Sequence, residues 1–234
     1  MKLPLAAVAA IILASIPAGC VTRNSDDAVI AAVGALEPSV VLLTMRVPAE
    51  HKSDPYDDAY ASGIVVASGP WGSDVLTVQH AIDGAWNLRV TIDNKRRVPG
   101  RVVAQDTDLD VALVRTAVPD LPVVRLGSSA HLADRVGAVI GLIGYPIPDE
   151  FNDEALGLAT SLNTGRLSSL RKHALEVTLP IVPGESGGPV FLADTGEIVG
   201  IAESRFDDER SIGFALPIDD ARLFLHRHDA EHGF

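Results

Sequence analysis

The sequence predicts an all-β fold whose strands form a barrel or a sandwich. Of the 234 residues, 47% are hydrophobic and only 5% are aromatic, and a core of valine, isoleucine, leucine and alanine suits short β-strands. The 20 glycines and 15 prolines supply turns between the apolar runs. The long helical stretches that βαβ units require are scarce. We expect strands over residues 39–47, 63–67, 75–81, 88–92, 111–115, 136–143, 175–179 and 198–202.

A short helix is expected on each side of this β-domain. Residues 25–36 carry acidic side chains in the first turn, which favours the helix dipole, and the expected apolar face consists of Val29, Ile30, Val33 and Leu36. A second helix is expected over residues 217–225, with Pro217 and two acidic residues in its first turn. Residues 226–234 are expected to form a solvated, frayed tail, with metal binding by its histidines as the alternative.

The first 19 residues have the pattern of a secretory signal peptide. Lys2 precedes an apolar stretch over residues 3–16, and small residues precede Cys20. The stretch is too short for a comfortable membrane span. Because Cys20 is the single cysteine of the sequence, no disulfide can form within the chain.

The charge of the chain argues against a nucleic-acid partner. The formal net charge is −12, the sequence has a pI near 4.9, and no basic stripe is present, so contacts to a phosphate backbone are not expected. The acidic residues of segment 48–61 suit an exposed hairpin tip, with a metal-binding loop as the alternative. We therefore expect no metal site.

A possible nucleophile lies in the run Gly184-Glu185-Ser186-Gly187-Gly188-Pro189. A serine hydroxyl needs a base to take its proton and donors to hold the negative charge that develops on the attacked carbonyl. Glycines tolerate positive φ, so this turn can present the amides of Gly184 and Ser186 as an oxyanion hole. The alternative is a glycine-rich hairpin between two strands.

Two upstream segments supply the other groups that an activated serine needs. The apolar run over residues 75–81 carries His80 near its end, and imidazole is the side chain most often used as a base near pH 7. Asp110 directly precedes the apolar run over residues 111–114, so its carboxylate can lie under cover and orient the imidazole through the second ring nitrogen. The order His80, Asp110, Ser186 is that of the chymotrypsin template.

The segments around these three residues resemble trypsin-like serine proteases, and more narrowly the protease domain of the bacterial HtrA group. The resemblance runs from about residue 38 to 225 and includes the runs 76–85, 110–114, 125–129, 136–146, 164–168 and 212–217. It implies two six-stranded antiparallel β-barrels, over residues 37–120 and 121–225, the second ending in the C-terminal helix. It also implies a catalytic triad of His80, Asp110 and Ser186, a polypeptide substrate, and no cofactor. No PDZ region follows, which departs from typical members of the group.

The N-terminus resembles a bacterial lipoprotein signal in which Cys20 becomes the lipidated first residue. Residues 20–24 are then expected to form a flexible tether between a lipid on Cys20 and the folded domain. Val21, in place of an aspartate, resembles outer-membrane rather than inner-membrane sorting. Pro17 departs from the leucine usual three positions before the cysteine, and an ordinary secretory signal is the alternative.

The preference of the substrate pocket follows from two segments. Ile181 and Val182 lead into the serine turn, and their apolar character predicts a pocket for an apolar side chain. Glu203 and Arg205 are expected on the opposite wall, where a salt bridge would narrow the pocket and an unpaired Glu203 would favour a basic side chain. Two functions remain: an exported, membrane-anchored endopeptidase acting on envelope proteins, and a noncatalytic adaptor that keeps the protease fold.

Overall fold

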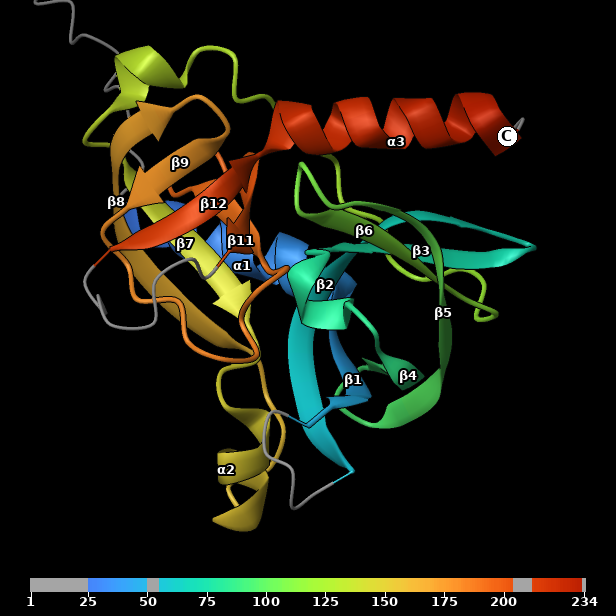
Figure 1. The fold of residues 1–234 in the computed structure, drawn as a ribbon. Helices are drawn as coiled ribbons and strands as arrows, with labels where there is room; N and C mark the ends of the chain where they lie inside the picture. Colours follow the sequence, from blue (N-terminus) through green and yellow to red (C-terminus); the bar gives the residue numbers. More distant parts are fainter. Residues whose placement is uncertain (1–24, 50–54, 204–211, 233–234) are drawn as a thin grey trace, which may run out of the picture.

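The computed structural model describes residues 25–49, 55–203 and 212–232, which form two closed barrels side by side (Figure 1). The first barrel consists of β1 (Val40–Pro48), β2 (Tyr56–Gly69), β3 (Gly72–Thr77), β4 (Trp86–Ile92), β5 (Arg96–Asp106) and β6 (Val111–Thr116). The second consists of β7 (Val139–Gly144), β8 (Ser161–Arg171), β9 (Ala174–Val177), β10 (Pro189–Leu192), β11 (Ile198–Glu203) and β12 (Gly213–Pro217). All strand pairs within the barrels are antiparallel. The predicted fold class is confirmed.

Each barrel closes because one strand pairs with the next strand in sequence on one edge and with a more distant strand on the other. In the first barrel β1 pairs with β2 and β4, and in the second β10 pairs with β11 and β7. Closure leaves no edge strand with unpaired backbone groups. The serine turn, which joins β9 to β10, therefore projects from a rigid frame.

The apolar residues form a core inside each barrel and a third core between the barrels. Alternation along β1 sends Leu43 into the first barrel, whereas Leu42 points to the third core. Leu142 and Leu167 belong to the interior of the second barrel. The third core joins side chains of both barrels with two helices, and its members include Ile64, Leu76, Val111, Ile143, Phe191, Ile201 and Phe224. The two halves of the site are thus held together by a continuous apolar layer.

Helix α1 (Ser25–Leu36) packs through part of the expected apolar face together with two alanines. Leu36 is buried and Val33 packs against the core, as predicted, and Ala28 and Ala32 are also buried, whereas Ile30 is 69% exposed. The alanines lie four residues apart on one face, and a Cβ built on Gly196 would lie 3.1 Å from the Cβ of Ala32. Helix α1 therefore approaches the turn of Gly196, between β10 and β11, too closely for a branched side chain at position 32. The 3₁₀ helix η1 (Glu37–Ser39) then leads into β1.

Helix α3 (Ile218–His232) crosses over both barrels (Figure 1). The helix passes the expected end at Leu225, so the prediction of a frayed tail is wrong for residues 226–232. His228 is buried, and Arg227 pairs with Asp106 of the first barrel, with 3.5 Å between Nη1 and Oδ2. Contact with the first barrel stabilises the last turns of helix α3, which contain too few apolar residues for the sequence to predict a helix there. The remaining short helices are η2 (His80–Ile82), η3 (Leu132–Arg135) and α2 (Pro148–Asp153).

Candidate active site

The turn between β5 and β6 holds Asp110 in an unusual backbone conformation. Asp110 has φ of 53°, a left-handed value that aspartate tolerates better than most residues. Oδ1 of Asp106 accepts the amides of Asp108 and Leu109, each at 3.1 Å, and this side-chain cap stabilises the turn. The chain then enters β6, which is buried at its first four positions.

Asp110 holds His80 by two hydrogen bonds. Oδ2 lies 2.6 Å from Nδ1 of the imidazole, and Oδ1 accepts the backbone amide of His80 at 2.8 Å. With both carboxylate oxygens engaged on one residue, the ring and its backbone are fixed together. A carboxylate at Nδ1 favours the tautomer with the proton on that nitrogen, which makes Nε2 the basic position. The His80 side chain is 42% exposed, so a substrate can reach it.

The serine turn begins as a type II β-turn over residues 182–185. The amide of Glu185 donates to the carbonyl of Val182 at 3.0 Å, with Pro183 and Gly184 between them. Gly184 has φ of 93°, the value that this turn type requires at its third position. A Cβ at Gly184 would lie 2.2 Å from the carbonyl oxygen of Tyr145, so only glycine fits there.

Four successive carbonyl groups of this turn are hydrogen-bonded. The carbonyl of Pro183 accepts from the amide of Ile147 at 2.8 Å, and the carbonyl of Glu185 accepts from the amide of Gly188 at 3.0 Å. The carbonyls of Gly184 and Ser186 accept from the hydroxyl and the amide of Ser62, at 2.7 and 2.8 Å. The amides of Glu185 and Gly187 donate to the carbonyls of Val182 and Ala202. The amides of Gly184 and Ser186 have no acceptor within the part of the chain that the structure describes. These are the two donors predicted for an oxyanion hole.

The serine turn contacts the segment that carries the histidine. A Cβ on Gly187 would lie 2.1 Å from the carbonyl oxygen of Ser62 and 2.3 Å from Oγ1 of Thr77, so a glycine is needed for this approach. Thr77 is the last residue of β3, and His80 follows it at the start of η2. Ser186 itself is 6% exposed. The seam between the barrels therefore brings together the two elements that carry the predicted base and nucleophile.

Glu185 is fully buried directly beside Ser186. Its Oε1 accepts from Nδ2 of Asn163 at 2.7 Å, and its Oε2 accepts from the amide of Val182 at 3.0 Å. Burial raises the pKa of Glu185 to about 7, although the hydrogen bond from Val182 acts in the opposite direction. The amide of Glu185 also donates to the carbonyl of Val182, so the backbone and the side chain of Glu185 both bind Val182 and stabilise the turn.

The residues predicted to line the substrate pocket differ in how far they are buried. Ile181 is half-buried and packs against the core of the second barrel, and Val182 is half-buried in the turn. Glu203 ends β11 and is fully buried. Arg205 and Cys20 lie outside the described residues. No group of three potential metal ligands occurs among the residues that the structure describes.

Sequence reasoning missed three residues that support the serine turn. Ser62 is a hydroxyl residue inside a fully buried stretch of β2, and a polar group in such a stretch is a signal for a specific hydrogen bond. Asn163 and Ile147 carry no such signal. Ile147 has φ of 32°, which crowds its branched side chain while its amide donates to Pro183.

A histidine held by a carboxylate on one six-stranded barrel, and a glycine-flanked serine turn on another, is the arrangement of the chymotrypsin class. Comparison with known proteins agrees with this class. The family model of the trypsin-like peptidase domain matches residues 61–201. The chain belongs to this family, and its relatives identify it as a protease domain of the HtrA type.

The chain is 33% identical over 181 residues to the putative serine protease HhoB of Synechocystis sp., covering 72% of this chain and 40% of that protein. It is 29% identical over 169 residues to a probable periplasmic serine endoprotease, DegP-like, of Halomonas elongata, covering 68% and 32%. The chain thus spans less than half the length of these relatives. Among solved structures, the HtrA-type protease AlgW with a tripeptide has a TM-score of 0.68 and 25% identity, covering 88% of this chain and 64% of that one.

Proposed function

We propose that this chain is a serine endopeptidase that hydrolyses peptide bonds by acyl transfer to Ser186 and then to water. The observation that carries the proposal is the hydrogen bonding of the serine turn. Buried amides are normally paired, yet the amides of Gly184 and Ser186 have no acceptor among the described residues, while the neighbouring carbonyls are all engaged. Two such amides beside a hydroxyl are suited to a developing negative charge.

In the proposed reaction, Oγ of Ser186 attacks the carbonyl carbon of the substrate while Nε2 of His80 takes the hydroxyl proton. The amides of Gly184 and Ser186 stabilise the oxyanion, and Asp110 stabilises the imidazolium. His80 then gives the proton to the leaving amine as the C–N bond breaks. A water molecule attacks the acyl group on Ser186 with His80 again accepting a proton, and that proton returns to Oγ as the acid leaves.

Labelling with a fluorophosphonate probe tests this proposal directly. We expect the wild-type protein to be phosphonylated on Ser186, because only a serine with an adjacent base reacts quickly. Ser186→Ala should lose labelling and peptide hydrolysis while keeping its melting temperature. The control is Ser73→Ala, which removes a buried hydroxyl away from the site and should still be labelled. A folded wild-type protein that neither labels nor cleaves peptides would indicate the adaptor function instead.

The position of the pocket residues supports a preference for an apolar side chain before the scissile bond. Ile181 and Val182 are apolar and partly exposed beside the serine turn, whereas Glu203 is fully buried and exposes no charge at the surface. A peptide library should show enrichment of apolar residues at this position. Strong enrichment of lysine or arginine would contradict it.

We further propose that the chain is exported to the bacterial envelope and anchored through a lipid on Cys20, facing the periplasm from the outer membrane. The signal pattern of residues 1–19 and the periplasmic relative support export. No helix among the described residues is long and apolar enough to span a bilayer. Fractionation of cells expressing the full chain tests the anchor, because Cys20→Ala should move the protein from the membrane fraction to the soluble periplasmic fraction.

A further inference from the structure

Ser62 lies in β2 of the first barrel, yet most of its hydrogen bonds connect it to the second barrel. Its Oγ donates to the carbonyl of Gly184 at 2.7 Å and accepts the amide of Tyr145 at 2.9 Å. Its amide donates to the carbonyl of Ser186 at 2.8 Å, and its carbonyl accepts Oγ1 of Thr77 at 2.8 Å. The residue is fully buried, so water does not compete for these groups.

These bonds fix the two peptide planes that follow the oxyanion donors. The peptide between Gly184 and Glu185 is held at its oxygen by Ser62 and at its nitrogen by Val182. The peptide between Ser186 and Gly187 is held at its oxygen by Ser62 and at its nitrogen by Ala202. Each fixed plane shares an α-carbon with the peptide whose amide is left open. The peptides that carry the open amides are held at their own oxygens by Ile147 and Gly188, and Ser62 fixes the peptide plane on the other side of each shared α-carbon.

We propose that Ser62 is a positioning residue that holds the turn of Gly184 with its amide directed to the oxyanion, an inference that rests on the proposed function. The turn has an accessible alternative, because a type II turn converts to type I when its central peptide rotates. In that state the amide of Gly184 points away from the substrate. The amide of Ile147 opposes this rotation directly by holding the carbonyl of Pro183, and the hydroxyl of Ser62 supports it by fixing the peptide plane that follows Gly184.

The hydroxyl contributes something that the backbone of Ser62 does not. The bonds made by its amide and carbonyl persist with any side chain, whereas those to Gly184 and Tyr145 require Oγ. In Ser62→Ala both partners lose a buried hydrogen bond, which is costly unless the chain moves to pair them again. The glycine is the partner with the greater conformational freedom. We therefore expect the serine turn, and not β7, to move.

The test compares Ser62→Ala with Ser73→Ala. Ser73 is a matched control because it is also fully buried in a strand of the first barrel, and its Oγ donates to a distant carbonyl, that of Val118, at 2.7 Å. Since loss of one oxyanion donor costs about 10²- to 10³-fold in kcat, partial loss through Ser62→Ala should lower kcat by roughly 10- to 100-fold with KM nearly unchanged. Ser73→Ala should keep kcat within about twofold at a similar loss of melting temperature.

Ser62→Cys provides a rescue, because a thiol of similar size restores a weak donor. Its kcat should lie between those of the wild type and Ser62→Ala. A peptide aldehyde, which forms a tetrahedral adduct in the oxyanion hole, should lose affinity for Ser62→Ala by the same factor as kcat. The proposal is overturned if kcat of Ser62→Ala matches that of Ser73→Ala, or if its loss appears in KM alone.

Amide hydrogen exchange separates this inference from the proposed function. Exchange over residues 184–188 should be faster in Ser62→Ala than in both the wild type and Ser73→Ala, whether or not the wild type cleaves peptides. Faster exchange in a protein without peptidase activity would refute the proposed function and retain the role of Ser62 in ordering the turn. Unchanged exchange together with an unchanged kcat in an active enzyme would refute the role of Ser62 alone.

Discussion

At the scale of single residues, the carboxyl group of Glu185 makes the folding stability depend on pH. It is fully buried, and desolvation raises its pKa from 4.5 to about 7 despite the amide of Val182. Between these two values an unfolded chain loses the proton while the folded chain keeps it. Folding stability from this group is therefore highest below pH 4.5 and declines as the pH rises to about 7.

Glu185→Gln should remove this pH dependence. Relative to the variant, the wild type should lose about 3 kcal/mol of unfolding free energy between pH 4.5 and 7, since one pKa unit corresponds to about 1.4 kcal/mol. The glutamine oxygen can accept from Val182, and a rotated Asn163 amide can accept from its nitrogen. Urea unfolding of both proteins across this pH range measures the difference. Glu154→Gln removes the same charge at an exposed position, so this control should show the same pH dependence of stability as the wild type. A stability difference between Glu185→Gln and the wild type that stays constant across this pH range would contradict the raised pKa of Glu185.

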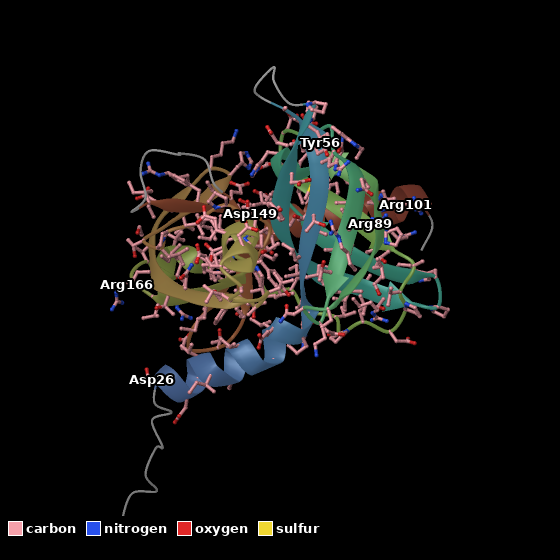
Figure 2. All side chains as sticks on the ribbon, turned by 90° about the horizontal axis from the view of Figure 1, so that it is seen from below. Asp26, Tyr56, Arg89, Arg101, Asp149 and Arg166 are labelled. Carbon is pink, nitrogen blue, oxygen red and sulfur yellow. The ribbon has the colours of Figure 1, made fainter. Side chains whose placement is uncertain are left out.

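At the scale of elements, the strands differ in how clearly the sequence predicts them. β3 is buried at all six positions, and the strand predicted over residues 75–81 overlaps its second half but extends too far, because η2 begins at His80. β5 is missing from the predicted strands because none of its residues is fully buried and it contains three arginines and a proline; its outward-pointing side chains, including Arg101, are visible in Figure 2. Pairing with β4 and β6, the strands before and after it in the sequence, keeps it in the barrel, and this pairing leaves no apolar pattern within the strand itself.

Helix α3 provides a test of how the two barrels are joined. Phe224 is 6% exposed and packs in the core between the barrels, whereas its neighbour Leu223 is 52% exposed. Phe224→Ala should lower the free energy of unfolding by about 3 kcal/mol because it leaves a cavity in that core. Leu223→Ala should change it by less than about 0.5 kcal/mol. Denaturant unfolding measures both, and equal effects would show that the helix does not stabilise the barrels through this face.

At the scale of the whole molecule, the core between the barrels should make them unfold as one unit. The two tryptophans of the sequence, Trp71 and Trp86, both lie in the first barrel, so their fluorescence reports on that barrel. Leu142 is fully buried inside the second barrel. A destabilising substitution at Leu142 therefore changes the unfolding transition reported by the tryptophans only if the two barrels unfold cooperatively.

Leu142→Ala should lower the melting temperature seen by tryptophan fluorescence by roughly 6 to 12 °C, in step with far-UV circular dichroism. Leu156→Ala, at a position that is 72% exposed, is the control and should leave both signals unchanged. A fluorescence transition that stays at the wild-type temperature while circular dichroism shifts would mean that each barrel unfolds independently.

The sequence by itself determined the chemical groups of this protein and their order. Turn residues, short apolar runs and the spacing of a histidine, an aspartate and a glycine-flanked serine are local patterns, and each can be recognised within a few positions. They predicted the all-β class, and they named His80 and Asp110, whose side chains the structure places 2.6 Å apart.

The tertiary structure alone decided which backbone groups of the serine turn are held and which stay open. Ser62 and Gly184 are 122 positions apart, and Asn163 reaches Glu185 from β8, a strand that the sequence did not reveal. Hydrogen bonds of this kind depend on barrel closure and on burial, which raise the cost of any unpaired group. Neither quantity is a property of a short stretch of sequence, so the support of the turn became visible only when both barrels were in place.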